Sequence, residues 1–250
     1  MIQYKLGKQP ATYDNRTLKF AKYDDRSLLD KIPKVVGHDN LFDDVNGWGM
    51  LANDRYGCCV ISSMMHQSML WNKAARGIDV KYTDDLCIDT YHKVNHTTED
   101  RGTNMLKALK YRRKHGILDA EGKVHKIAAF AYLNVHDIDQ IRAAIYLFGL
   151  VDIGFAVPDY CMEQFEHGRP WVVKENGVNE GGHCVPIVGF NEMFNVVTWG
   201  KEQKMEVNFF SRYADEAYAI MSGDYFNGKK QTPEGFDLSQ LKKDLAILEG

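Results

Sequence analysis

The residues best suited to chemistry are a cysteine and a histidine that lie far apart in the chain. Cys59 follows the turn-forming residues 53–58, and apolar residues then recur at helical spacing from Val60 to Leu70. A helix start carries unpaired backbone N–H groups and partial positive charge, which favour a thiolate. His183 follows two glycines and opens an apolar, strand-like run. The pair predicts a thiol nucleophile with an imidazole base.

Asn53 lies six residues before Cys59 and could donate its amide N–H to a developing oxyanion. Two alternatives stay open at this stage. Cys58 is a rival nucleophile, and each of Cys59 and His183 could instead be an ordinary buried core residue. The glycines before His183 argue against the core alternative for the histidine, because they permit close backbone approach at a cleft.

These motifs, in this order, resemble the papain-like cysteine peptidase superfamily. Asn53 stands for the family's oxyanion amide, Gly57 for its glycine and Cys59 for its nucleophile. His183-Cys184-Val185 resembles the family's histidine motif, and Thr198-Trp199-Gly200 resembles its Ser-Trp-Gly. Cysteine and histidine are 124 residues apart, close to the roughly 130–150 of papain relatives. The resemblance covers residues 40–222.

The resemblance implies an α+β fold of two lobes, with a helical N-terminal lobe, an antiparallel β lobe and an active-site cleft between them. It makes Cys59, His183 and Asn53 the catalytic residues. Gly102, Gly57 and Trp199 become substrate-binding residues, Gly102 through backbone hydrogen bonds to an extended peptide.

The chain departs from the family pattern at the residue that orients the histidine. The family places an asparagine directly before Ser-Trp-Gly, and here that position is Val197, which cannot hydrogen-bond an imidazole. Asn195 and Thr198 are nearby substitutes. The departure leaves open a weakly active Cys–His dyad or a lapsed enzyme that keeps the fold.

The function predicted from the resemblance is hydrolysis of a peptide or amide bond by Cys59 and His183. The alternative is a weak or inactive papain-fold phage structural or accessory protein that acts by binding, since the whole pattern is similar to uncharacterised phage and prophage proteins. A transglutaminase-like acyl transferase shares the Cys–His logic, but it uses an aspartate orienter that has no counterpart here.

Composition limits the kinds of ligand and partner that we expect for the chain. The chain has 250 residues, 44% of them hydrophobic, and a net charge of −3, so no basic field favours nucleic acid. Five cysteines without a CxxC pair favour neither a disulfide framework nor a zinc site. We expect no cofactor, no metal and no membrane contact. We expect a peptide or protein substrate, other phage proteins as partners under the alternative, and a cytoplasmic or virion-associated location without a signal peptide.

Local patterns predict the elements that position these residues. We expect a polar arm over 1–40 with a short helix near 26–31, a catalytic domain over 41–222, and a C-terminal extension over 223–250 with a helix from Asp237. The arm is expected to pack against the body and not to fill the cleft. The expected helices are 59–75, 84–95, a third to His115 capped by Thr103, and a fourth from Asp137 to Phe148. The expected strands are 126–135, 150–157, 171–173, 183–190, 195–198 and 205–209.

Overall fold

The computed structural model describes residues 4–22, 32–39, 41–42, 47–227 and 229–235. Its α-helices are α2 (Cys59–Arg76), α3 (Asp84–Asn95), α4 (Met105–Lys114), α5 (Ile138–Phe148), α6 (Tyr160–Glu166) and α7 (Val207–Tyr213). Its strands are β1 (Leu18–Lys19), β2 (Val36–Gly37), β3 (Ile117–Leu118), β4 (Val124–His125), β5 (Ile127–Tyr132), β6 (Val151–Pro158), β7 (Asn179–Asn191), β8 (Met193–Thr198), β9 (Lys201–Met205) and β10 (Ala214–Ser222).

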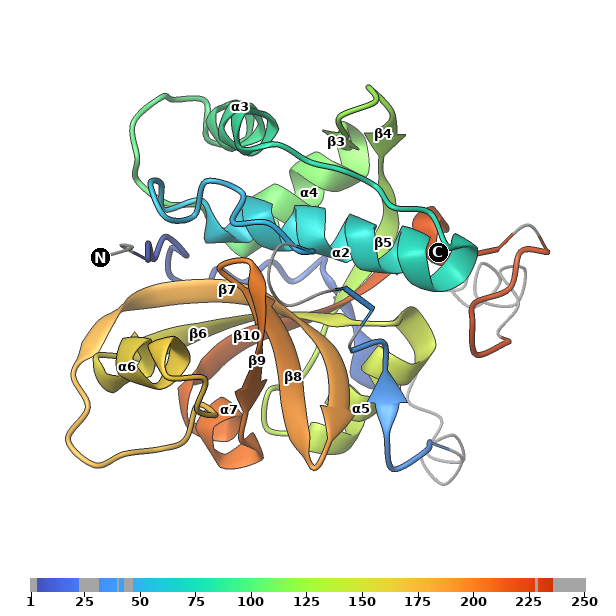
Figure 1. Ribbon diagram of the computed structural model, residues 1–250. Coiled ribbons are helices and arrows are strands. Elements are labelled where there is room, and N and C mark those ends of the chain that lie inside the picture. The colour runs from blue at the N-terminus through green and yellow to red at the C-terminus, as the bar shows by residue number, and fades with distance from the viewer. Residues whose placement is uncertain (1–3, 23–31, 40, 43–46, 228, 236–250) are drawn as a thin grey trace.

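The elements form two lobes, as the sequence predicts. Helices α2, α3 and α4 lie on one side, and a strongly curved sheet flanked by α5, α6 and α7 lies on the other (Figure 1). The sheet has the order β1-β5-β10-β6-β7-β8-β9, with β2 paired to β7. Among its described strands, β1 and β5 pair in parallel and the other neighbours pair antiparallel. Helix α2 packs on β7 where the lobes meet, so the two strongest motifs of the sequence face each other there.

Local signals account for several helix ends. Helix α2 ends at Gly77, whose left-handed φ of 67° a glycine adopts without strain. The Thr83 side chain caps α3 at the N–H of Leu86, and the Asp137 side chain caps α5. These three helices are confirmed with their predicted ends displaced by at most one residue.

Other expectations are wrong. Asn104, not Thr103, caps α4, because Thr103 is extended and pairs with Lys8. Residues 205–209 do not form a strand, since β9 ends at Met205 and α7 begins at Val207. The 171–173 segment contributes only a single bridge from Trp171 to Met205. The helices expected near 26–31 and from Asp237 lie outside the described residues.

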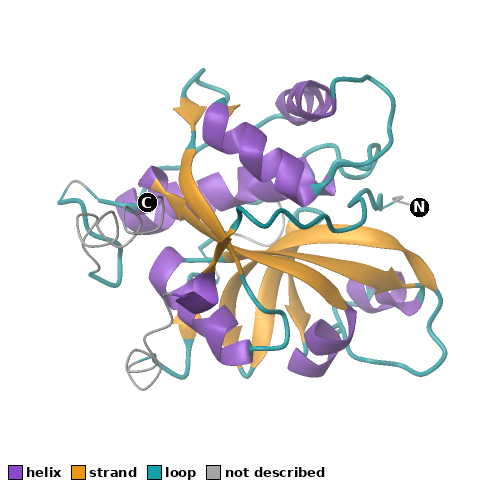
Figure 2. Ribbon diagram, turned by 180° about the vertical axis from the view of Figure 1, so that it is seen from behind, coloured by secondary structure: helices purple, strands orange, loops and turns teal. Residues whose placement is uncertain are grey.

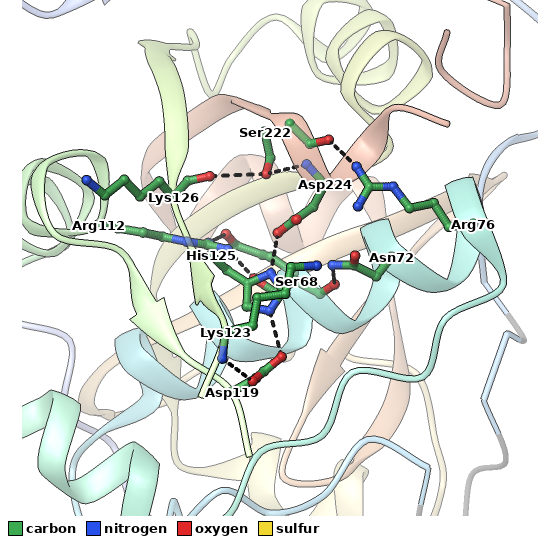
Figure 3. A network of polar contacts seen from close by, with 12 residues as sticks. Ser68, Asn72, Arg76, Arg112, Asp119, Lys123, His125, Lys126, Ser222 and Asp224 are labelled. Atoms are coloured by element: carbon green, nitrogen blue, oxygen red, sulfur yellow. Dashed lines mark hydrogen bonds and ion pairs between the residues drawn. The ribbon is translucent and has the colours of Figure 1, made fainter. Parts of the chain in front are cut away.

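A buried polar network fixes the helical lobe to the C-terminal turn that follows β10. Figure 3 shows the His125 ring between two carboxylates, with Nδ1 2.8 Å from Asp224 and Nε2 2.9 Å from Asp119. Burial disfavours the charged imidazole, but the two carboxylates outweigh burial and raise the pKa of His125. Arg112, fully buried, donates to Ser68 on α2 at 2.5 Å. The network therefore holds α2, whose first residue is Cys59, against its neighbours.

Candidate active site

Cys59 is the first residue of α2, as predicted, and its side chain is buried. The turn before it is held by Asp100, whose carboxylate accepts the Gly57 N–H at 3.0 Å. Cys58 lies elsewhere: its sulfur is 3.4 Å from the Leu51 carbonyl oxygen and 3.8 Å from the Cys87 sulfur. The geometry therefore places Cys59, and not Cys58, against β7.

His183 lies on β7, and its imidazole ring contacts Thr198 and Trp199. Its Nε2 is 2.6 Å from the Thr198 hydroxyl, and its ring stacks on Trp199 at 4.4 Å and 18°. Within the described part of the chain, its buried Nδ1 has no hydrogen-bond partner. Burial lowers the pKa of His183 to about 3, so the imidazole is neutral in this arrangement.

The residues around the histidine answer the question left by Val197. Val197 is buried in an apolar cluster with Cys59 and other residues of the helical lobe. Thr198 takes the hydrogen bond to the ring, whereas Asn195 donates to Asp39 at 2.8 Å and is engaged there. Of the two substitutes considered from sequence, the structure brings only Thr198 to the histidine.

An extended segment of the chain itself lies between the lobes. We name residues 4–10 the strap; Figure 2 shows the N-terminal segment running between the helices and the sheet. A pocket beside the strap is lined by strap residues 6–10 together with residues 100–102 and 180–182. The prediction that the arm does not fill the cleft is wrong for residues 4–10. It relied on the scarcity of apolar side chains, whereas these residues are held by backbone hydrogen bonds, which that pattern does not reveal.

The strap is held by its backbone on both sides of the groove. On the helical side, Thr103 N–H donates to Gly7 O at 2.7 Å, and Gln9 N–H donates to Thr103 O at 3.0 Å. On the β side, the N–H groups of Gly7 and Lys8 reach Gly182 O at 3.1 and 3.0 Å. This is the main-chain pairing by which grooves bind extended peptides.

Glycines make this close approach possible. A Cβ on Gly7 would lie 1.8 Å from the Gly57 carbonyl oxygen, and one on Gly102 would lie 2.2 Å from Gly7 O. A Cβ on Gly182 would lie 2.4 Å from Lys8 O. Gly57 and Gly102 thus contact the strap as close-packed surfaces, but the backbone ladder expected of Gly102 is made by Thr103.

Asn53 and Trp199 also contact the strap. The Asn53 side-chain amide donates to Lys5 O at 3.1 Å, and the Trp199 indole N–H points at the same oxygen from 3.4 Å. The Asn53 carbonyl accepts the Lys5 N–H at 2.9 Å in return. Both side chains therefore donate to a peptide carbonyl that lies in the groove.

The Cys59 thiol is covered by this arrangement. Burial raises the pKa of Cys59 to about 12, although N–H groups of Cys184, Gly7 and Val60 favour the thiolate. The helix start predicts a lowered pKa for the Cys59 thiol, and with the strap in place that expectation is wrong because desolvation outweighs the helix end. Thiol and imidazole are therefore both neutral in this arrangement.

Sequence reasoning missed four residues of the groove. Gly7 and Lys8 belong to the strap, Thr103 supplies its backbone ladder, and Glu216 on β10 forms an ion pair with Lys8 at 3.0 Å. Of these four residues, Gly7 is the one that a local pattern could have marked, as a glycine that permits close backbone approach. The other three contact partners that are distant in sequence, which no local pattern reveals.

Solved structures share the fold. Xylellain, a cysteine protease from Xylella fastidiosa, superimposes with a TM-score of 0.67 at 17% identity over 88% of this chain and 96% of its own. Procathepsin B S9 from Trypanosoma congolense gives 0.62 at 11% identity, covering 87% and 86%. A Carica candamarcensis cysteine protease in complex with E-64 gives 0.54 at 14%, covering 76% and 99%. The fold is therefore the papain-like two-lobed α+β fold.

No protein-family model and no curated protein matches the chain by sequence. The comparisons do not bear on the likeness to phage and prophage proteins. In the part of the chain that the structure describes, no helix combines the length and apolarity needed to cross a bilayer.

Proposed function

We propose that the protein is a thiol hydrolase of peptide or amide bonds, held latent by its own strap. The observation that carries the proposal is the strap itself: an extended peptide backbone lies hydrogen-bonded between Gly182 and Thr103, with the Gly7 N–H beside the Cys59 thiol. A groove that holds one peptide backbone beside Cys59 is built to hold another.

The proposed roles follow from the contacts. When Nε2 of His183 donates to Thr198, Nδ1 keeps a free lone pair. Among the described residues no hydrogen bond joins Nδ1 to Cys59, and the proposal is that Nδ1 takes the Cys59 proton when the two side chains approach each other. Thr198 and the stacked Trp199 then orient the ring. The thiolate adds to the substrate carbonyl, and the proton held on Nδ1 passes to the leaving amine as the carbon–nitrogen bond breaks. Water then hydrolyses the acyl-enzyme with the same imidazole as base.

Asn53 is proposed to stabilise the oxyanion. Its amide already donates to a peptide carbonyl, and the backbone N–H of Cys59 at the helix start is a second donor of the kind an oxyanion hole uses. Gly57, Gly102 and Trp199 are proposed to contact the substrate where they now contact the strap.

Release of the strap would change the protonation of the pair. With the groove open to water, the desolvation that raises the pKa of Cys59 and lowers that of His183 would diminish. Both shifts favour the thiolate–imidazolium form. The proposal therefore makes latency and activation two states of one site.

The alternative is a papain-fold binding protein, for example a phage accessory protein, that does no chemistry. The neutral, buried state of both groups is the observation that favours it. A fluorogenic peptide assay with a strap-displaced chain separates the two: hydrolysis that disappears on Cys59→Ala supports the hydrolase, and its absence from a chain with an accessible Cys59 supports the binding protein.

A further inference from the structure

The Lys8 side chain fills a pocket that no part of the proposed reaction uses. Only 2% of the Lys8 side chain is exposed. Lysine is rarely buried unless its charge is paired, and Lys8 is paired. Its Nζ donates to Asp215 Oδ2 at 2.7 Å, pairs with Glu216 Oε1 at 3.0 Å and reaches its neighbour's carbonyl, Gln9 O, at 3.3 Å. The Lys8 ammonium thus makes two hydrogen bonds, to Asp215 and Gln9, and a close ion pair with Glu216.

Two features of the sheet shape this pocket. Glu216 on β10 is paired with Gly154 on β6, and Asp215 is an extra residue between register positions, so the strand bulges there. A bulge places two consecutive residues opposite one partner, which lets both carboxylates approach one ammonium. Gly154 leaves room for the stem, because a Cβ there would lie 2.0 Å from Lys8 Cε.

The pocket needs a cation when the strap leaves. Glu216 is 1% exposed, and the Tyr218 hydroxyl donates to its Oε2 at 3.0 Å. Burial raises the pKa of Glu216, and Lys8 opposes that shift. A buried carboxylate whose counter-charge is delivered by a removable segment is a binding site for another cation of the same shape.

The pocket is also placed for specificity. Lys8 directly follows Gly7, whose N–H lies beside the Cys59 thiol, and the backbone on either side of Lys8 is held by Thr103 and Gly182. A side chain in this pocket therefore belongs to a residue close to the reacting bond.

From this geometry we infer that the Asp215–Glu216 pocket selects substrates with a lysine or arginine side chain next to the bond that is cut. The inference rests on the proposed hydrolase function, because only a hydrolase cuts the peptide that the pocket binds. Recognition of a basic side chain by the groove stands on the contacts of Lys8 alone.

Binding tests the pocket without requiring catalysis. The host is the full chain carrying Gly7→Ala and Lys8→Ala, which remove the internal occupant, and Cys59→Ala, which prevents turnover. The probes are a labelled peptide of residues 4–12 and the same peptide with norleucine in place of Lys8. Fluorescence anisotropy should show the lysine peptide binding at least tenfold more tightly. Equal affinity, or binding by neither peptide, overturns the inference.

Variants of the pocket localise the preference. Glu216→Gln in the host should reduce the preference for lysine to below threefold, whereas Glu163→Gln, at an exposed carboxylate of α6, should leave it unchanged. Gly154→Val should weaken the lysine peptide because it fills the space of the stem. A lysine preference that survives Glu216→Gln contradicts the assignment.

Hydrolysis separates the two proposals. With Cys59 restored, fluorogenic peptides carrying lysine, arginine, norleucine or glutamate near the scissile bond should be cut with the basic side chains preferred at least tenfold in kcat/KM. Hydrolysis without this preference overturns the pocket and leaves the hydrolase. Preferential binding without any hydrolysis overturns the hydrolase and leaves a groove that recognises basic peptides.

Discussion

Gly7 is the residue whose replacement should open the site most selectively. Its φ is not in the left-handed region, so alanine fits the backbone, but the added Cβ would lie 1.8 Å from Gly57 O and 2.3 Å from Gly57 C. Those are main-chain atoms of the turn that carries Cys59, and they have no side-chain freedom with which to yield. Gly7→Ala should therefore move the strap and leave the turn in place.

The magnitude follows from the hydrogen bonds that residues 7 and 8 make. Three backbone bonds hold them: Gly7 N–H and Lys8 N–H to Gly182 O, and Thr103 N–H to Gly7 O. At about 1 kcal/mol net for each bond, their loss weakens docking by ~3 kcal/mol. Since 1.4 kcal/mol is about a factor of ten, the open fraction should rise about 100-fold.

Timed alkylation with iodoacetamide, quantified by mass spectrometry, measures that fraction at Cys59. The expected result is labelling of Cys59 about 100-fold faster in Gly7→Ala than in the parent. Cys161 on α6 is an internal reference, because it is also buried and its pKa is also raised to about 12 by burial. Gly223→Ala is the matched control, since its Cβ meets nothing within 4 Å.

Two results would refute the reasoning. Labelling of Cys59 within threefold of the parent would mean that the strap does not cover the thiol. A parallel rise at Cys161 would mean that Gly7→Ala unfolds the protein generally and does not release one segment.

Three further predictions concern the groups behind the site. In a strap-displaced chain, Thr198→Val should lower kcat at least tenfold because His183 loses its Nε2 partner, and Thr198→Ser should restore it; equal rates for both variants would remove Thr198 from the mechanism. Burial raises the pKa of Asp152 to about 7, so the free energy of unfolding should fall as pH rises from about 4 to about 7. In urea unfolding over this range, the free energy of unfolding of Asp152→Asn should exceed that of the parent by up to ~4 kcal/mol at the upper end. A difference that does not change with pH would contradict this. Because the pKa of His125 is raised in the folded state, its contribution to stability is complete below about pH 6.5 and is lost as pH rises through the folded pKa. His125→Gln should therefore lower the free energy of unfolding most at low pH, within the range where Asp119 and Asp224 stay ionised. A loss of stability that grows with pH would contradict this.

The sequence was informative wherever structure depends on neighbours along the chain. The caps at Thr83 and Asp137 and the stop at Gly77 are local, and the helices they bound are confirmed. The order of cysteine and histidine motifs predicted the α+β two-lobed fold, and the arrangement of α2 against β7 agrees with it.

The errors concern partners that are distant in sequence. Thr103 reads as a helix cap, but its N–H and C=O pair with the strap, about 95 residues away. Residues 201–204 are all polar and residues 207–210 include three apolar side chains, yet the first run lies in strand β9 and the second begins α7. Tertiary pairing overrides local propensity in both places.

The candidate site shows the same division. Residue types and order singled out Cys59, His183 and Asn53, and the structure brings Asn53 and Cys59 to the strap, while His183 contacts Thr198 and Trp199. Which neighbour reaches the imidazole depends on strand twist and on the face each side chain takes, so Thr198 could not be chosen over Asn195 from sequence. The thiol's environment depends on a segment more than 50 residues before it, which no local pattern near Cys59 reveals.

Hydrolysis by the strap-displaced chain tests the central claim most directly. Initial rates with a lysine-containing fluorogenic peptide would be compared for the parent, Gly7→Ala, and Gly7→Ala combined with Cys59→Ala. We expect little turnover by the parent, clear turnover by Gly7→Ala and none by the double variant. No turnover by Gly7→Ala while Cys59 is rapidly alkylated, or turnover that survives Cys59→Ala, would contradict the account of a latent cysteine hydrolase.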